Sequence, residues 1–161
     1  MDAMDAVLAA VGSSGLAEVL RASRLVYPLV NATHILGIAL LVGSIAALDA
    51  RILGYRRSVP LGDAASLLLP VTITGLVLAV TTGALLFTVK PQDYAANPVF
   101  LVKLGLITLA VANALSLRFR PAWRAALAGG PVTAGLRASA VLSLVLWLAV
   151  LVAGRMIAFF G

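Results

Sequence analysis

The chain has 161 residues, of which 62% are hydrophobic and 11% are charged, and its formal net charge is +6. Soluble domains normally carry about 25% charged residues, so this composition indicates a membrane protein. The sequence contains no cysteine, which excludes disulfides, thiolate metal sites and cysteine nucleophiles.

Residues 1–23 are expected to form a short interfacial helical segment at the membrane surface. The first twenty residues include three acidic residues and no basic residue, unlike the positively charged start of a secretory signal. The Gly-Ser-Ser-Gly stretch at 12–15 interrupts this segment. It predicts two short helices, the second capped by Ser14 or Gly15.

Four apolar segments follow, and each has the ~20 residues needed to cross a ~30 Å hydrocarbon layer. They cover residues 25–53, 67–89, 98–118 and 137–160. The chain is therefore expected to be one membrane domain over residues 1–161, an all-α integral membrane four-helix bundle. Asp63 is the expected N-cap of the second span, and Asn97 that of the third, with Pro98 as its first helical residue.

Arginine is concentrated in two loops on the same side of the predicted bundle. The loops after the first and third spans carry Arg51, Arg56, Arg57, Arg118, Arg120, Arg124 and Arg137. The positive-inside rule places these loops in the cytoplasm and both termini outside. The basic and aromatic stretch 118–124 suits a juxtamembrane anchor next to membrane lipids, and we expect no nucleic-acid partner.

Small residues recur every four positions on the first two spans and predict close helix packing. The first row is Ala39, Gly43 and Ala47, and the second is Gly75, Ala79 and Gly83. At 100° per residue, Gly43 lies about 180° from His34. Either the first row faces the bundle and His34 faces outward, or His34 faces inward and the row is a seam for a homo-oligomer. We expect His34 inside, because a lone polar group facing hydrocarbon has no compensation.

Every predicted span has a polar residue in its outer half. These residues are Asn31 and His34 on the first span, Thr81 and Thr82 on the second, Lys103 on the third and Arg155 on the fourth. By helical rise, His34 lies roughly 10 to 14 Å deep, and Lys103 and Arg155 lie about 8 Å from the same edge. The outer halves carry no acid, so an anionic guest is expected: a propionate, a carboxylate, a lipid phosphate or a quinone oxygen.

Each of these residues also has a purely structural interpretation. Lys103 and Arg155 lie near helix ends, from which long side chains can extend to the headgroups. Asn31 and His34 can form hydrogen bonds between helices. His34 is too short to extend to the headgroups, so it is the residue on which a functional interpretation depends.

Histidine inside a helical bundle is a common axial ligand of haem iron, and nearby cations suit the haem propionates. The chain has one histidine. The other axial position would be empty or filled by Met156, Lys103, a small molecule or a second subunit. A divalent-metal site is not expected, because no Asp, Glu or Cys lies near His34 in the spans. A hydrolytic triad lacks its carboxylate, and whether the protein is an enzyme stays open.

Three stretches, NATHILGIALLVGSIAALDARILG, FLVKLGLITLAVANAL and LWLAVLVAGRMIAFF, resemble a family of uncharacterised bacterial four-helix membrane proteins. The likeness covers most of residues 24–160. More distantly, the first-span histidine and the stretch FLVKL are similar to HemJ-type protoporphyrinogen oxidases and copper-resistance D-like membrane proteins. The HemJ resemblance implies a b-type haem with His34 as an axial ligand and Lys103 at the functional site. The chain departs from it in being shorter and in lacking a tryptophan just ahead of Lys103.

The leading hypothesis is a bacterial inner-membrane protein that binds haem b, or a similar tetrapyrrole, for electron transfer to or from quinone. In it His34 ligates iron, Lys103 and Arg155 neutralise propionates, and Asn31, Thr81 and Thr82 complete the polar lining. Two alternatives stay open. One is a cofactor-free accessory or structural subunit that pairs with a partner membrane subunit. The other is a small transporter or quinone-binding module.

Overall fold

The computed structural model describes residues 3–160, except for the side chains of Ala158 and Phe160, and this part of the chain is helical without strands. The four long helices are α3 (Val26–Leu53), α4 (Leu61–Phe87), α6 (Pro98–Arg118) and α8 (Ala134–Phe160). Four short helices are α1 (Ala3–Gly12), α2 (Gly15–Ala22), α5 (Pro91–Ala96) and α7 (Pro121–Leu127). The expectation of an all-α chain with four candidate membrane spans is confirmed.

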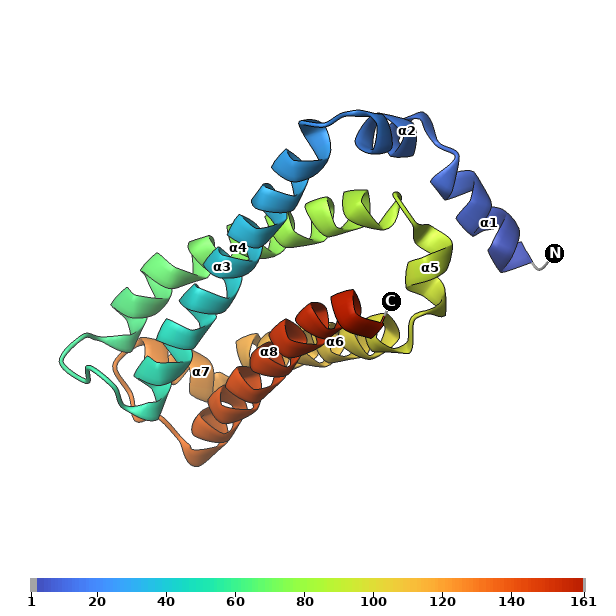
Figure 1. The fold of residues 1–161 in the computed structure, drawn as a ribbon. Coiled ribbons are helices and arrows are strands. Elements are labelled where there is room, and N and C mark those ends of the chain that lie inside the picture. Colours follow the sequence, from blue (N-terminus) through green and yellow to red (C-terminus); the bar gives the residue numbers. More distant parts are fainter. Residues whose placement is uncertain (1–2, 161) are drawn as a thin grey trace.

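The long helices form two pairs. Helix α3 packs along α4, α6 packs along α8, and contacts between α3 and α8 join the pairs. Figure 1 shows the pairs close together where α7 lies and separating toward the end that holds α5, α2 and the C-terminus. We call the first the loop end and the second the terminal end.

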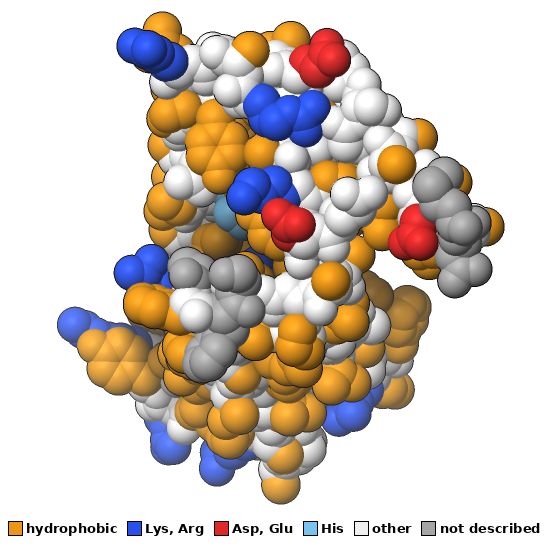
Figure 2. Space-filling model, turned by 45° about the vertical axis from the view of Figure 1, so that its right-hand side comes forward, with side chains coloured by type: hydrophobic (Ala, Val, Ile, Leu, Met, Phe, Trp, Pro, Cys, Tyr) orange, Lys and Arg blue, Asp and Glu red, His pale blue; other side chains and the backbone are white. Residues whose placement is uncertain are grey.

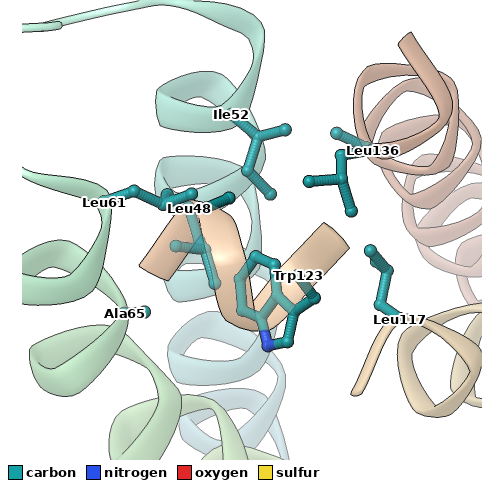
Figure 3. Close-up of a cluster of buried hydrophobic side chains, with 9 residues drawn as sticks. Leu48, Ile52, Leu61, Ala65, Leu117, Trp123 and Leu136 are labelled. Atoms are coloured by element: carbon teal, nitrogen blue, oxygen red, sulfur yellow. The ribbon is translucent and has the colours of Figure 1, made fainter. Parts of the chain in front are cut away.

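The loop end is closed by a hydrophobic cluster that α7 completes. Trp123 of α7 is 7% exposed and lies among side chains from all four long helices (Figure 3). The other buried members are Leu48, Ile52, Leu61, Ala65, Leu117, Ala126, Leu136 and Ala140. Burying an aromatic ring of this size is among the larger stabilising terms available to a small bundle. The cluster therefore fixes how the two helix pairs meet at this end.

A second buried cluster lies farther toward the terminal end. Leu41 of α3 packs there with Ala110 of α6 and with side chains of α8, namely Leu146, Trp147 and Val150. Helix α4 contributes Leu76 only as a partly buried neighbour. The middle of the molecule is thus held by α3, α6 and α8, with α4 attached through α3.

Glycines allow the close approach of α3 and α4. A Cβ added to Gly37 would lie 2.7 Å from the backbone nitrogen of Ala79, and one added to Gly75 would overlap the backbone nitrogen of Leu41. Backbones in contact gain dispersion energy and interhelical hydrogen bonds, which drive helix association in lipid. The predicted small row on the second span therefore forms the α3–α4 interface.

The small row on α3 has a different position. Ala39, Gly43 and Ala47 are all exposed, and a Cβ on Gly43 would meet nothing within 4 Å. His34, on the other side of α3, faces α4. Of the two orientations considered for the first span, the structure has the one with His34 inside and the small row outside.

Helix ends agree with the sequence interpretation at two positions and differ at a third. The Ser14 hydroxyl accepts from the nitrogen of Ala17 at the start of α2, and Asn97 Oδ1 accepts from Val99 N at 2.9 Å. Asp63, however, lies in the first turn of α4, which begins at Leu61 after Pro60. Leu61 starts the helix early because its side chain is buried in the loop-end cluster. An acid in the first turn still stabilises the helix dipole.

Helices α1 and α2 meet at a 51° bend, and together they are apolar enough to form a fifth, broken span. Helix α1 packs on α5 across the terminal end. The Arg21 guanidinium of α2 stabilises the packing of these helices by donating to the carbonyls of Gly12 (2.7 Å) and Val89 (3.1 Å). Charge-assisted bonds of this kind are among the stronger ones, so α1, α2 and the end of α4 are held together.

Candidate functional site

His34 is half-buried on α3 and contacts Thr82 on α4. Its Nδ1 lies 2.9 Å from Thr82 Oγ1. The threonine hydroxyl also lies 2.5 Å from the Leu78 carbonyl of its own helix, to which it donates. A hydroxyl has a single proton, so Thr82 must accept from Nδ1–H. In the neutral ring this bond selects the tautomer with the proton on Nδ1 and the lone pair on Nε2, and the backbone of Ala79 is a further hydrogen-bonding neighbour of the imidazole.

Gly83 makes room for the imidazole. A Cβ at this position would lie 3.1 Å from His34 Cε1, closer than most side-chain contacts allow. The ring thus rests on the backbone of α4 beside Thr82. Two neighbouring residues of α4 therefore set both the position and the tautomer of His34.

Lys103 is the charged side chain of α6 that turns inward. It is half-buried, and its Nζ and Cε lie against Gly154 of α8, where an added Cβ would be 3.6 Å from both. Its charge acts on His34 electrostatically. Lys90–Asp93 is the one ion pair among the described residues, so Lys103 has no acidic partner there. A partly desolvated ammonium without a counter-ion favours an anionic ligand.

Figure 2 shows the single histidine in a hollow between the two halves of the molecule, with charged side chains of both signs beside the opening. We call this hollow the recess. It corresponds to the terminal end, where the helix pairs separate and α4 makes little contact with α6. His34 is therefore reachable from outside the bundle.

Aromatic residues stand near the opening of the recess. Tyr27 lies two turns before His34 on the same face of α3. Tyr94 of α5 is close enough to Tyr27 for the two side chains to interact electrostatically. Tyr94 also contacts Phe87 and Phe100, with ring centroids 6.1 and 5.4 Å away. Burial, together with the nearby Tyr27 and Asp93, raises the pKa of Tyr94. Tyr94 thus stays neutral in ordinary buffers and contributes an apolar ring with a hydroxyl.

The structure does not bring every expected residue to His34. Asn31, Thr81 and Arg155 are exposed. The Thr81 hydroxyl bonds the Val77 carbonyl of its own helix at 2.7 Å, and the Arg155 guanidinium lies 5.2 Å from the centre of the Phe159 ring. The residues that meet or act on one another are His34, Thr82 and Lys103.

The residues around His34 offer one nitrogen ligand, which suits a cofactor that needs a single protein nitrogen. The described residues contain no cluster of three or more His, Cys, Asp or Glu side chains that could hold a metal ion. A haem needs only an axial imidazole, whose other nitrogen is usually bonded to a carboxylate, a backbone carbonyl or water. Here the Thr82 hydroxyl accepts from Nδ1 in place of these partners, and Lys103 supplies a cation for an acidic substituent. Met156 is half-buried two residues beyond Gly154.

A second polar cluster, between α3, α6 and α8, was not expected from the sequence. Asp49 is 5% exposed and Ser143 is the polar group beside its carboxyl. One turn away on α8, the Ser139 hydroxyl donates to Asn113 Oδ1 at 2.6 Å, and Asn113 Nδ2 donates to the Ser139 carbonyl at 3.0 Å. The signal that could have revealed it is an acid four residues inside a long apolar run, with serines spaced by four on the last span.

Comparisons of the chain with protein-family models, with curated proteins and with solved structures gave no match.

Proposed function

We propose that this protein is a bacterial inner-membrane protein that binds haem b, or a similar tetrapyrrole, in the recess and serves in electron transfer. The observation that carries the proposal is the His34–Thr82 bond, which leaves Nε2 as a neutral nitrogen donor inside a helical bundle. A neutral imidazole whose other nitrogen is held by a hydrogen bond is a good axial ligand.

In this proposal each residue has a distinct task. His34 would ligate the iron through Nε2, Thr82 would orient the imidazole, and Lys103 would neutralise a propionate. Met156 is the candidate second ligand, since it lies on α8 close in sequence to the glycine that Lys103 contacts. When bound, the haem would supply a one-electron couple that no side chain here provides.

The proposed orientation places both termini and the recess on the outer side. Seven arginines lie at the loop end, in the α3–α4 and α6–α8 connections and in the helix turns that flank them; six are exposed, and Arg51 is partly so. An excess of arginine in short loops marks the cytoplasmic side of inner-membrane proteins. The recess would then open toward the periplasmic surface, where a membrane quinone or a soluble donor can approach.

Haem titration tests the proposal. Purified protein stripped of any haem is titrated with haemin and followed by Soret absorbance, in wild type and in His34→Ala. We expect saturable binding by wild type and an affinity at least about tenfold lower in the variant, equal to about 1.4 kcal/mol. Equal affinities would show that haem binds elsewhere or without specificity.

A second candidate is a cofactor-free structural subunit, favoured by one observation. The α3–α4 interface contains another interhelical bond, between the hydroxyls of Ser44 and Thr72 at 2.7 Å. His34–Thr82 would then be the second bond of a helix-packing pair. This candidate predicts that His34→Ala and Ser44→Ala lower thermal stability alike and that neither changes a spectrum.

A further inference from the structure

We infer that Asp49 is an intramembrane proton-binding site, which takes up and releases one proton at its carboxyl. This site is separate from the recess and does not depend on haem. His34 and Asp49 are fifteen residues apart on α3, or about 22 Å along the helix axis.

The burial of Asp49 carries the inference. Only 5% of the residue is exposed, and its Oδ2 has no hydrogen-bond partner among residues 3–160 as described. The described chain has no ion pair to this carboxyl. A buried carboxylate without a cation is disfavoured, so the surroundings of Asp49 favour the neutral acid more than water does.

The neighbours of Asp49 offer polarity without charge. Helix α8 presents Ser143, α6 presents Asn113 farther along, and neither can titrate. On α4 the residues that pack near this level, Ala65 and Leu68, are apolar, and the Ser44–Thr72 bond lies more than one helical turn away. Within α3, Arg51 is directed to the loop, where its Nε donates to the Val59 carbonyl at 2.6 Å. No charged group therefore holds Asp49 in one protonation state.

The position of Asp49 supports exchange with water. It lies four residues before the end of α3 at Leu53, about 6 Å from that helix end. Trp147 of α8, one turn beyond Ser143, also has its indole nitrogen buried without a partner. A purely structural polar layer would satisfy its donors and acceptors, as Asn113 and Ser139 do. Unsatisfied groups on α3 and α8 fit a site that exchanges protons when these helices separate slightly.

Infrared spectroscopy of purified protein tests the inference. The chain has six acidic side chains, and exposed Asp and Glu are mostly ionised at pH 5. We expect a carboxylic-acid carbonyl band at pH 5 that Asp49→Asn largely removes and that Asp63→Asn, a change at an exposed position, leaves intact. The band should give way to a carboxylate band as the pH is raised and return when the pH is lowered.

Labelling keeps the test independent of the variant's folding. Wild type grown with carboxyl-labelled aspartate should show the acid band shifted, with no substitution made. No acid band at pH 5 would overturn the inference, and so would a band insensitive to the label. A band that persists unchanged in strong alkali would identify a permanently neutral structural group and overturn it equally. Haem affinity should be the same in Asp49→Asn and wild type. A negative result for Asp49 therefore does not bear on the proposal that haem binds in the recess.

Discussion

His34 and Thr82 are joined across the α3–α4 interface by a hydrogen bond whose direction is set by the threonine. Because Thr82 gives its proton to the Leu78 carbonyl, it can only accept from Nδ1 of the imidazole, at 2.9 Å. For the neutral ring, this pair of bonds selects the tautomer with the proton on Nδ1. The proposed function depends on the unprotonated Nε2 of that tautomer.

Replacing Thr82 by valine should lower haem affinity several-fold and shift the Soret maximum, because the imidazole loses its orienting partner. Folding stability should fall by about 0.6 kcal/mol, the average for an interhelical bond in lipid. The neighbouring Thr81→Val is the control, since the Thr81 hydroxyl bonds only its own helix. Similar spectra for the two variants would argue against a role for Thr82 at the site.

Gly37→Ala should destabilise the protein by about 1–3 kcal/mol, because the new methyl would lie 2.7 Å from the Ala79 nitrogen and overpack the interface. Gly43→Ala is the matched change on the same helix. It meets nothing within 4 Å and should be neutral or stabilising by up to about 1 kcal/mol through helix propensity. Thermal melts in detergent measure both. A destabilised Gly43→Ala beside an unaffected Gly37→Ala would mean that α3 packs through its other face.

Lys103→Met should separate binding from stability. Losing the cation should reduce haem affinity about tenfold, or about 1.4 kcal/mol. The haem-free protein should melt no earlier, because a half-buried ammonium without an acid is not a stabilising group. Lys90→Met removes an exposed charge paired only with Asp93 and should change neither quantity. If both lysine variants bind haem as wild type does, Lys103 has no part in the site.

Trp123→Ala should cost about 3–5 kcal/mol, as expected when a buried aromatic residue is deleted. Trp123 is 7% exposed in the loop-end cluster, whereas Phe119, at 76%, is the aromatic control four residues earlier. Chemical denaturation should show a large loss for Trp123→Ala and a small one for Phe119→Ala. A small loss at Trp123 would mean that α7 does not hold the two helix pairs together.

Helix positions were largely predictable from the sequence, because their signals are local. The length of each apolar run and the Asn97-Pro98 start of α6 depend on adjacent residues alone. The start of α4 was not predicted, since Leu61 is recruited by burial against distant residues in the loop-end cluster. Asp63 is a good N-cap type, and tertiary packing outweighed that local preference.

The composition of the site was less predictable, because it depends on which way each helix faces. Thr81 and Thr82 are adjacent, and only the rotation of α4 makes Thr82 the partner of His34. Arg155 and Lys103 looked equivalent by depth, yet one is exposed beside Phe159 and the other turns toward Gly154. The burial of Asp49 was not predicted, since it appears only once α8 is placed against α3.

The absorption spectrum of protein purified after expression with ample haem tests the central claim most directly. Wild type should show a Soret band with stoichiometric haem, and His34→Ala should lose most of it while keeping the helical content of wild type. A wild-type protein without Soret absorbance, or a His34→Ala variant with an unchanged band, would contradict the proposal that His34 binds haem.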